Sequence, residues 1–180
     1  MQTISIVTGN PGKVAEIEAM ANGQLDFVMH DLDLTEIQSM DLQEIVRAKA
    51  RSAYDKIRGP VIVEDVSAGL ESWQGLPGPF IKFFIKKLGA DGLYKLGNGQ
   101  HQRATITCLA AYYDGERELY GEGTIHCDVV APRGSNGFGF DPIMVPDGQT
   151  KTMAEMSPEE KRAISHRGLA FRALLNQLAR

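Results

Sequence analysis

A run in the middle of the chain constrains the fold more than any other segment. Residues 60–70 read PVIVEDVSAGL, in which three consecutive β-branched residues predict a short buried strand. Glu64 and Asp65 stand at the end of that strand, where open α/β sheets bind ligands in a crevice. Because successive strand side chains point to opposite faces, we expect one of the two carboxylates to lead the chemistry. Taken alone, the run is equally typical of a strand followed by a solvated loop.

Strands and helices are predicted on both sides of this run. Further strands are expected at residues 3–8, 27–29, 104–113 and 119–130, the last two joined as a hairpin by a tight turn at Asp114-Gly115. Helices are expected from Val14 onward, over 41–58, over 81–88, after a cap at Ser157-Pro158, and over 169–178. Residues 89–102 are rich in glycine and polar side chains and are predicted to be a connector.

Length and composition are those of an ordinary soluble protein. At 180 residues the chain can form one sizeable domain with room for two lobes, and its 43% hydrophobic content supports a real core. It has no apolar run long enough to cross a membrane, and it begins with a strand-like segment rather than a signal peptide. Cys108 and Cys127 show no metal-binding spacing, so we expect buried thiols in a reducing compartment, by default the cytoplasm.

The net charge of −4 argues against nucleic acid as a partner but leaves room for a small polyanion where cations converge. Residues 8–13, TGNPGK, join a strand to a helix, so backbone N–H groups and the helix dipole would face an anion, with Lys13 adding a full charge. The G-x-x-G-K spacing and Val14 in place of Ser or Thr exclude a Walker A loop. A plain turn is the alternative. Lys49 lies beside an apolar helix stripe, which is typical of a lysine that reaches water.

A second candidate region lies near the C-terminus. Residues 137–142, GFGFDP, place two aromatic rings and an acid on a loop loosened by glycine. A ring there could stack on a flat base, and a carboxylate could accept hydrogen bonds from its edge. Residues 165–168, SHRG, interrupt the last two predicted helices with polar side chains. Each of these motifs is weak evidence by itself.

Together the motifs have a specific order along the chain. The sequence resembles the inosine triphosphate pyrophosphatase family, which hydrolyses non-canonical purine nucleoside triphosphates. The matching segments occur in family order between residues 8 and 167, and they are Thr8–Lys13, Val63–Asp65, Gly75–Pro79, Ala131–Gly134, Phe138–Pro142 and Ser165–Arg167.

The resemblance implies a fold and a reaction. The fold is a single elongated α/β domain over residues 1–180, built around a long mixed β-sheet, with two lobes and a central cleft, and usually a homodimer. The reaction converts a nucleoside triphosphate and water into the monophosphate and pyrophosphate, with magnesium required. Inosine, deoxyinosine and xanthosine triphosphates are the family's substrates.

The resemblance also implies roles for individual residues. The triphosphate would be held by Lys49 and by the turn Thr8, Gly9, Asn10, Pro11, Gly12 and Lys13. Glu36 and Asp65 would be the magnesium ligands, with Asp65 also proposed as the general base. Val66 stands where the family often has a small or hydroxyl residue, which leaves a backbone contact intact. Phe138 would stack on the base, with Gly139, Phe140 and Asp141 completing that wall. Lys161, His166 and Arg167 would face the base and the phosphates, and Ser165 would line the pocket. Phe140 stands where some members carry Trp, a change that preserves an apolar contact.

The chemistry of these residues agrees with that implication. Mg²⁺ prefers an oxygen shell made of one or two carboxylates with phosphates and waters, and Glu36 and Asp65 supply that number. Donors such as Arg167 would hydrogen-bond the keto oxygen at the purine 6-position, where adenine carries an amino group instead. Two alternatives remain open. One is a pyrophosphatase for other modified triphosphates, which predicts loss of the base-binding residues. The other is a non-catalytic nucleotide sensor, which predicts loss of a carboxylate.

Overall fold

The structure is a computed structural model and describes residues 3–21, 23 and 25–179. Its elements in chain order are β1 (Thr3–Val7), α1 (Pro11–Ala21), β2 (Asp26–His30), α2 (Leu42–Ile57), β3 (Val61–Leu70), η1 (Glu71–Trp73), β4 (Pro77–Gly78), α3 (Ile81–Leu88), α4 (Gly92–Leu96), β5 (Gln102–Tyr113), β6 (Glu118–Val129), η2 (Asp141–Ile143), β7 (Met144–Pro146), α5 (Pro158–Ile164) and α6 (His166–Leu178). Among the described residues, none of the helices has both the length and the apolar character needed to cross a bilayer.

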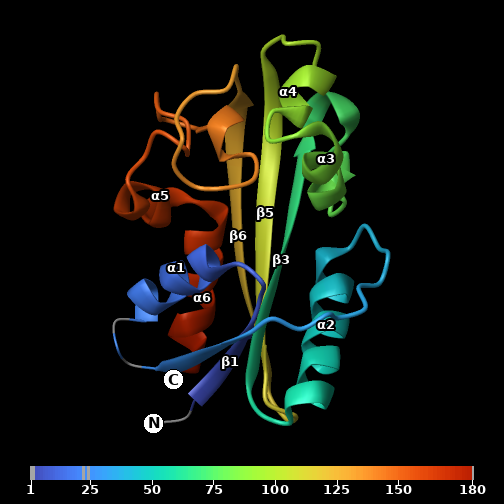
Figure 1. Cartoon of the computed structure of the whole chain (residues 1–180), viewed down its shortest axis with the longest axis vertical. Coiled ribbons are helices and arrows are strands. Elements are labelled where there is room, and N and C mark those ends of the chain that lie inside the picture. The colour runs from blue at the N-terminus through green and yellow to red at the C-terminus, as the bar shows by residue number, and fades with distance from the viewer. Residues whose placement is uncertain (1–2, 22, 24, 180) are drawn as a thin grey trace. The chain divides into compact units, whose positions relative to one another are not determined.

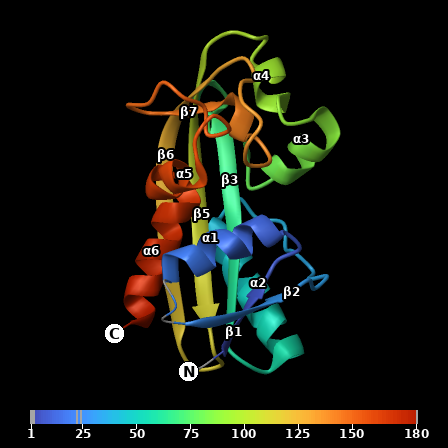
Figure 2. The same ribbon diagram turned by 60° about the vertical axis from the view of Figure 1, so that its left-hand side comes forward.

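The strands belong to one mixed sheet. In the described part of the chain its order is β2-β1-β3-β5-β6-β7, and β4 pairs with β3 beside this path. Strand β1 pairs in parallel with β2 and β3, whereas β6–β7 and β3–β4 are antiparallel. The strands and their helices can be followed in Figures 1 and 2. The prediction of an α/β fold around a mixed sheet is therefore confirmed.

The chain is divided into two compact units. Unit 1 takes the described residues of 1–65, 108–123 and 167–180, and unit 2 takes residues 66–107 and 124–166. Strands β3, β5 and β6 each contribute residues to both units. Two units are in keeping with the two lobes that the sequence implied, and the single domain over residues 1–180 stays a prediction.

In unit 1 helices cover both faces of the strands. Figure 1 shows α1 and α6 on one side and α2 on the other. Helix α2 begins where the sequence predicted, because the Asp41 side chain accepts the Gln43 N–H at 2.7 Å. Its apolar stripe, including Val46 and Ala53, packs with Val61 and Val63 of β3 in one buried cluster. This packing fixes α2 against the strand that carries both acidic residues of the central run.

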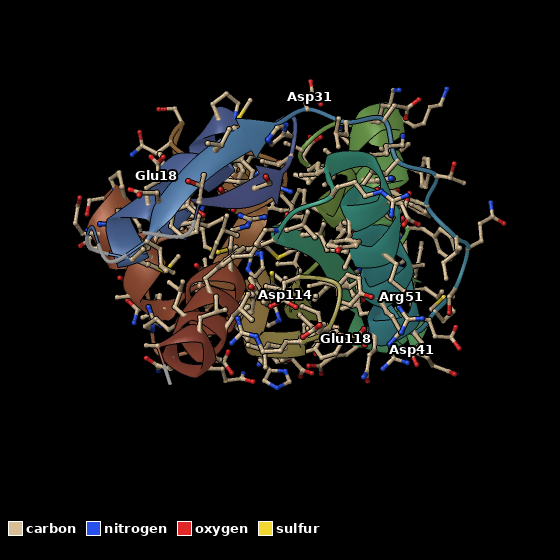
Figure 3. All side chains as sticks on the ribbon, turned by 90° about the horizontal axis from the view of Figure 1, so that it is seen from below. Glu18, Asp31, Asp41, Arg51, Asp114 and Glu118 are labelled. Atoms are coloured by element: carbon tan, nitrogen blue, oxygen red, sulfur yellow. The ribbon has the colours of Figure 1, made fainter. Side chains whose placement is uncertain are left out.

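The hairpin of β5 and β6 forms as predicted, and its turn is held by one carboxylate. Asp114 accepts backbone N–H groups of Glu116 at 3.1 Å and Arg117 at 2.7 Å. Partial burial alone would raise the pKa of Asp114, but these hydrogen bonds outweigh it and lower the pKa to about 2. Figure 3 labels Asp114 and Glu118 at this end, with Arg51 of α2 pairing with Glu118 at 3.6 Å.

In unit 2 one guanidinium ties three strands together. Arg103 on β5 donates to Asp128 on β6 at 2.9 Å, and in a forked pair to Asp147, just after β7, at 2.6 and 2.9 Å. Such bidentate geometry combines charge with fixed orientation. Helices α3 and α4 follow β4, and Figure 2 shows them beside each other.

The central strand is longer than predicted. Strand β3 spans ten residues, so Glu64 and Asp65 lie in its middle and not at its end. The expectation of a short strand was wrong because the sequence after Asp65 loses its β-branched character while its backbone still pairs. Ala68 and Gly69 pair with the two residues of β4, Gly78 and Pro77, and no strand was predicted there.

Two other boundaries differ from the predicted ones. The connector at 89–102 contains a helix, α4, because Leu93 is buried there despite the glycines on either side. The last helix begins at His166, three residues before the predicted start at Leu169. Ser165 alone, with extended backbone angles, separates α5 from α6. The capping box that begins α5, made by Ser157 and Glu160, forms as expected.

Gly121 of β6 lies directly against α6 in unit 1. A Cβ atom there would come 2.1 Å from the Ala170 carbonyl oxygen and 2.5 Å from the Leu174 amide nitrogen. We expect Gly121→Ala to lower the free energy of unfolding by about 1–3 kcal/mol, because the backbone of a packed helix must shift. Urea denaturation measures this. Gly59→Ala is the matched control: its Cβ would have no neighbour nearer than 3.8 Å. A Gly121→Ala variant as stable as the control would contradict this packing.

Candidate active site

The turn between β1 and α1 is closed by its own side chains. Thr8 Oγ1 accepts the Asn10 N–H at 3.1 Å, Asn10 Oδ1 accepts the Gly12 N–H at 2.9 Å, and the Asn10 carbonyl accepts the Lys13 N–H at 3.1 Å. Short polar side chains commonly satisfy turn N–H groups in this way. The expectation that these N–H groups point outward, unoccupied, is therefore wrong for all three. An anion bound here would have to exchange with the Asn10 side chain at Gly12.

Gly9 is in close contact with an acidic side chain. A Cβ atom at this position would lie 2.9 Å from Asp31 Oδ1, so only glycine lets the turn pass the carboxylate without a shift. Asp31 follows β2 and is exposed; Figure 3 labels it at the edge of the view. The turn thus has an anionic neighbour on one side as well as a lysine on the other.

Lys13 is paired with a buried carboxylate of β3. Its ammonium group donates to Glu64 Oε1, and the side chains are 24% and 6% exposed, respectively. Glu64 Oε2 accepts from Arg167 Nε at 3.4 Å, and Arg167 Nη1 lies 3.5 Å from Glu16 Oε2 on α1. The Cys108 thiol of β5 donates to the same Oε2 at 3.3 Å. Arg167, expected to face the base and the phosphates, is therefore part of this network in unit 1.

These contacts set the charge of the buried groups. Burial would raise the pKa of Glu64, but the positive charges of Arg167, Lys13 and Lys49, with the hydrogen bond from Lys13, hold that pKa well below its usual range. Burial, together with the adjacent Glu64 charge, raises the pKa of the Cys108 thiol well above its usual value. Glu64 is thus an anion at neutral pH, and Cys108 is a neutral thiol.

The lowered pKa of Glu64 predicts a pH-dependent contribution to stability. Its folded pKa lies below its ordinary value of 4.5, so the stabilisation is fully present above that pH and is lost as the pH falls toward the folded value. We expect the difference in unfolding free energy between the wild type and Glu64→Gln to be larger at pH 7 than at pH 3. Urea denaturation of both proteins at the two pH values measures it. Equal differences would show that the carboxylate charge contributes nothing.

On the other face of β3, two carboxylates surround one ammonium group. Lys49 of α2 donates to Glu36 Oε1 at 3.0 Å and to Asp65 Oδ2 at 3.2 Å, and to the Glu64 carbonyl oxygen at 3.4 Å. Within this group of three side chains, two carboxylates face one ammonium group. Lys49 does not simply reach solvent, since its side chain is only 16% exposed. The structure brings together both residues predicted for the metal, Glu36 and Asp65, and one of those predicted for the phosphates, Lys49.

This arrangement fits a hard divalent cation. Residues 3–21, 23 and 25–179 contain no group of three or more His, Cys, Asp and Glu side chains able to hold a metal ion by themselves. Mg²⁺ commonly takes one or two protein carboxylates and completes its shell with phosphate oxygens and water. Glu36 and Asp65 are two carboxylates that converge on one cation position, here the Lys49 ammonium group, and their number and oxygen chemistry fit that ion.

The aromatic loop of unit 2 is built on a buried ion pair. Asp141 Oδ2 accepts from Lys161 Nζ at 2.7 Å and from the Phe138 N–H at 2.8 Å, and both charged side chains are buried. The Lys161 ammonium also lies 4.4 Å from the Phe138 ring centroid. Asp141 and Lys161 therefore fix the position of Phe138. This is a supporting role, which the expectation of direct base contact did not include.

The remaining predicted residues of unit 2 are buried or half-buried. The Phe140 ring is buried, and its centroid lies 6.0 Å from that of His166, also buried. Gly139 approaches α3, since a Cβ there would lie 3.8 Å from Ile85 Cδ1. Ser165 is buried at the end of α5, and Val66 is half-buried in β3.

Comparison with known proteins identifies the family. A sequence model of the Ham1 family matches residues 4–177. The chain belongs to the Ham1 family. It is 40% identical over 174 residues to the inosine triphosphate pyrophosphatase of Schizosaccharomyces pombe, a match covering 94% of this chain and 92% of that protein. It is 44% identical over 177 residues to inosine triphosphate pyrophosphatase 2 of Trypanosoma cruzi, covering 95% and 89%. The resemblance stated from the six sequence segments is confirmed.

Solved Ham1 structures share the fold. A HAM1 protein from Coxiella burnetii superposes with a TM-score of 0.83 at 26% identity, covering 99% of both chains. The Ham1 protein of Staphylococcus aureus gives a TM-score of 0.80 at 27% identity, covering 99% of this chain and 98% of that one. The architecture described above is therefore that of the Ham1 family along its whole length.

One member of the site was missed by sequence reasoning. Glu64 was noticed only as the neighbour of Asp65, yet its carboxylate binds both Lys13 and Arg167. Its partners are 51 and 103 residues away along the chain, so no local spacing reveals them. The alternation of strand side chains was the available signal, because it places Glu64 on the face opposite Asp65.

Proposed function

We propose that this Ham1-family protein hydrolyses inosine, deoxyinosine and xanthosine triphosphates to the monophosphate and pyrophosphate. The observation that carries the proposal is the convergence of Glu36 and Asp65 on the Lys49 ammonium group, at 3.0 and 3.2 Å. Relatives named inosine triphosphate pyrophosphatase match the chain over more than nine-tenths of its length, which supports the same reaction class.

The phosphate end of the substrate is assigned to unit 1. Lys13, at the turn of residues 8–13, and Lys49 supply positive charge for the triphosphate. When bound by Glu36 and Asp65, Mg²⁺ would neutralise charge that develops on the leaving pyrophosphate. Asp65 would orient the attacking water or accept its proton, because its carboxylate lies with Glu36 against Lys49 and is partly exposed.

The base end is assigned to unit 2. Phe138 offers a ring for stacking, held in place by its N–H bond to Asp141 and by the Lys161 ammonium beside it. His166, Ser165 and the backbone of Val66 and Gly139 complete this set, and Arg167 is its neighbour in the chain. A donor placed at the purine 6-position favours a keto oxygen and leaves an amino group unpaired, at a cost of about 1–3 kcal/mol per group.

The cell context and assembly belong to the same proposal. We infer a homodimer in the cytoplasm, acting on free nucleotides and not on nucleic acid. Two free cysteines, both buried, are in keeping with a reducing compartment. The net charge of −4 disfavours a polynucleotide partner.

Product analysis tests the proposal directly. The purified protein is offered inosine, xanthosine, adenosine and guanosine triphosphates separately, each with Mg²⁺, and the products are separated by ion-exchange chromatography. We expect monophosphate and pyrophosphate, with strong preference for the first two substrates. Release of free phosphate, or equal rates on all four, would reject the base assignment. Binding of inosine triphosphate without turnover would favour a nucleotide sensor.

A further inference from the structure

Glu64 has two carboxylate oxygens, and each is used by a different cation. Oε1 accepts from the Lys13 ammonium on α1, and Oε2 accepts from Arg167 Nε at the start of α6. The Cys108 thiol adds a third hydrogen bond, at 3.3 Å. The carboxylate is 6% exposed and Arg167 is 4% exposed, so two elements far apart in the sequence are fixed to β3 by one buried anion.

Lys13 is the most solvent-accessible member of this network. In the part of the chain that the structure describes, Glu64 is the one hydrogen-bond partner of its ammonium group. An ammonium group has three N–H donors, so two remain for a ligand. The Lys13 side chain runs from the turn of residues 8–13 to the buried Glu64 carboxylate, and 24% of it is exposed to solvent. Its long chain is thus held in one orientation before any ligand arrives.

We propose that Glu64 is the positioning residue for the phosphate end of the substrate, acting through Lys13. This inference rests on the proposed function for its substrate but not for its geometry. A lysine tethered at its ammonium group loses little rotamer freedom when an anion binds, whereas a free one loses more. Glu64 itself does not touch the reacting atoms, because Asp65 and Glu36, the two carboxylates around Lys49, are on the opposite face of β3. The two adjacent acids therefore have separate tasks.

The test measures anion binding separately from turnover. Titration calorimetry gives the Kd of inorganic tripolyphosphate for the wild type and for Glu64→Gln, which keeps the shape and removes the charge. We expect Kd to rise about 10- to 30-fold, the effect of having to order an untethered lysine side chain when the anion binds. KM for inosine triphosphate should rise by a similar factor, with a smaller change in kcat. Cys108→Ala is the control, because it removes a partner of Glu64 Oε2 and not of the Oε1 that holds Lys13, and it should leave Kd unchanged.

A double-mutant cycle separates positioning from a structural role. In a Lys13→Met background, Glu64→Gln should change the Kd of tripolyphosphate by less than about twofold, because the residue it acts through is already gone. An equal loss in both backgrounds would overturn the proposal, as would unchanged binding by Glu64→Gln. If that variant does not fold, Glu64→Asp replaces it in the cycle, with the same criterion. If the wild type binds tripolyphosphate but hydrolyses no triphosphate, the proposed function fails while this cycle still decides the role of Glu64.

Discussion

Asp65→Asn is expected to reduce kcat for inosine triphosphate at least about a thousandfold while leaving the fold intact. The substitution removes a charge at nearly constant shape. It takes away one of two carboxylates around the Lys49 ammonium, and with it a cation ligand and the candidate base for the attacking water. Steady-state kinetics and circular dichroism on the same preparation measure the two effects.

The control makes the same chemical change elsewhere in unit 1. Asp26 is exposed on β2, and Asp26→Asn should keep kcat within about twofold of the wild type. Near wild-type turnover by Asp65→Asn would eliminate Asp65 from the chemistry. Loss of helical signal in that variant would instead assign it a structural role.

Phe138→Ala is expected to act on binding. Stacking of one base on an aromatic ring contributes about 1–3 kcal/mol, so KM for inosine triphosphate should rise about 5- to 150-fold, with kcat changed much less. The ring is well placed for this, because Asp141 accepts the Phe138 N–H and the Lys161 ammonium group lies over the ring.

Phe83→Ala provides the comparison, since Phe83 on α3 is 53% exposed and has no assigned role. Its KM should stay at the wild-type value. A Phe138→Ala variant that loses turnover at unchanged KM would contradict stacking. Unchanged values of both constants would remove Phe138 from the site.

Much of the fold could be predicted because its signals are local. The Asp41 cap, the Ser157 capping box and the alternating residues of the hairpin are each legible within a few positions. What could not be predicted depended on distant partners. The second half of β3 forms because β4 pairs with it. Helix α4 forms because Leu93 is buried, which the glycine-rich sequence around it does not predict.

The candidate site divides in the same way. The turn lysine and the central acids have short-range motifs, so their importance was evident. The roles of the charged residues around Phe138 were not, because Asp141 and Lys161 use their charges on each other and Asp141 also accepts the Phe138 N–H. The turn N–H groups were likewise taken as available, whereas Thr8 and Asn10 already occupy those of Asn10 and Gly12. Hydrogen-bond satisfaction is a property of three-dimensional neighbours, and sequence spacing records it poorly.

Because two adjacent acids lie on opposite faces of β3, the register of the strand decides which side chain each lysine meets. Side chains along a strand repeat every two positions, so a single-residue insertion between Val61 and Glu64 would exchange the two environments. It would place Glu64 opposite Lys49 and leave Lys13 facing Val63, an apolar neighbour. A two-residue change would preserve the faces and move both acids along the sheet. Length variation in this strand is therefore restricted by the chemistry of both faces at once, in addition to the packing of the core.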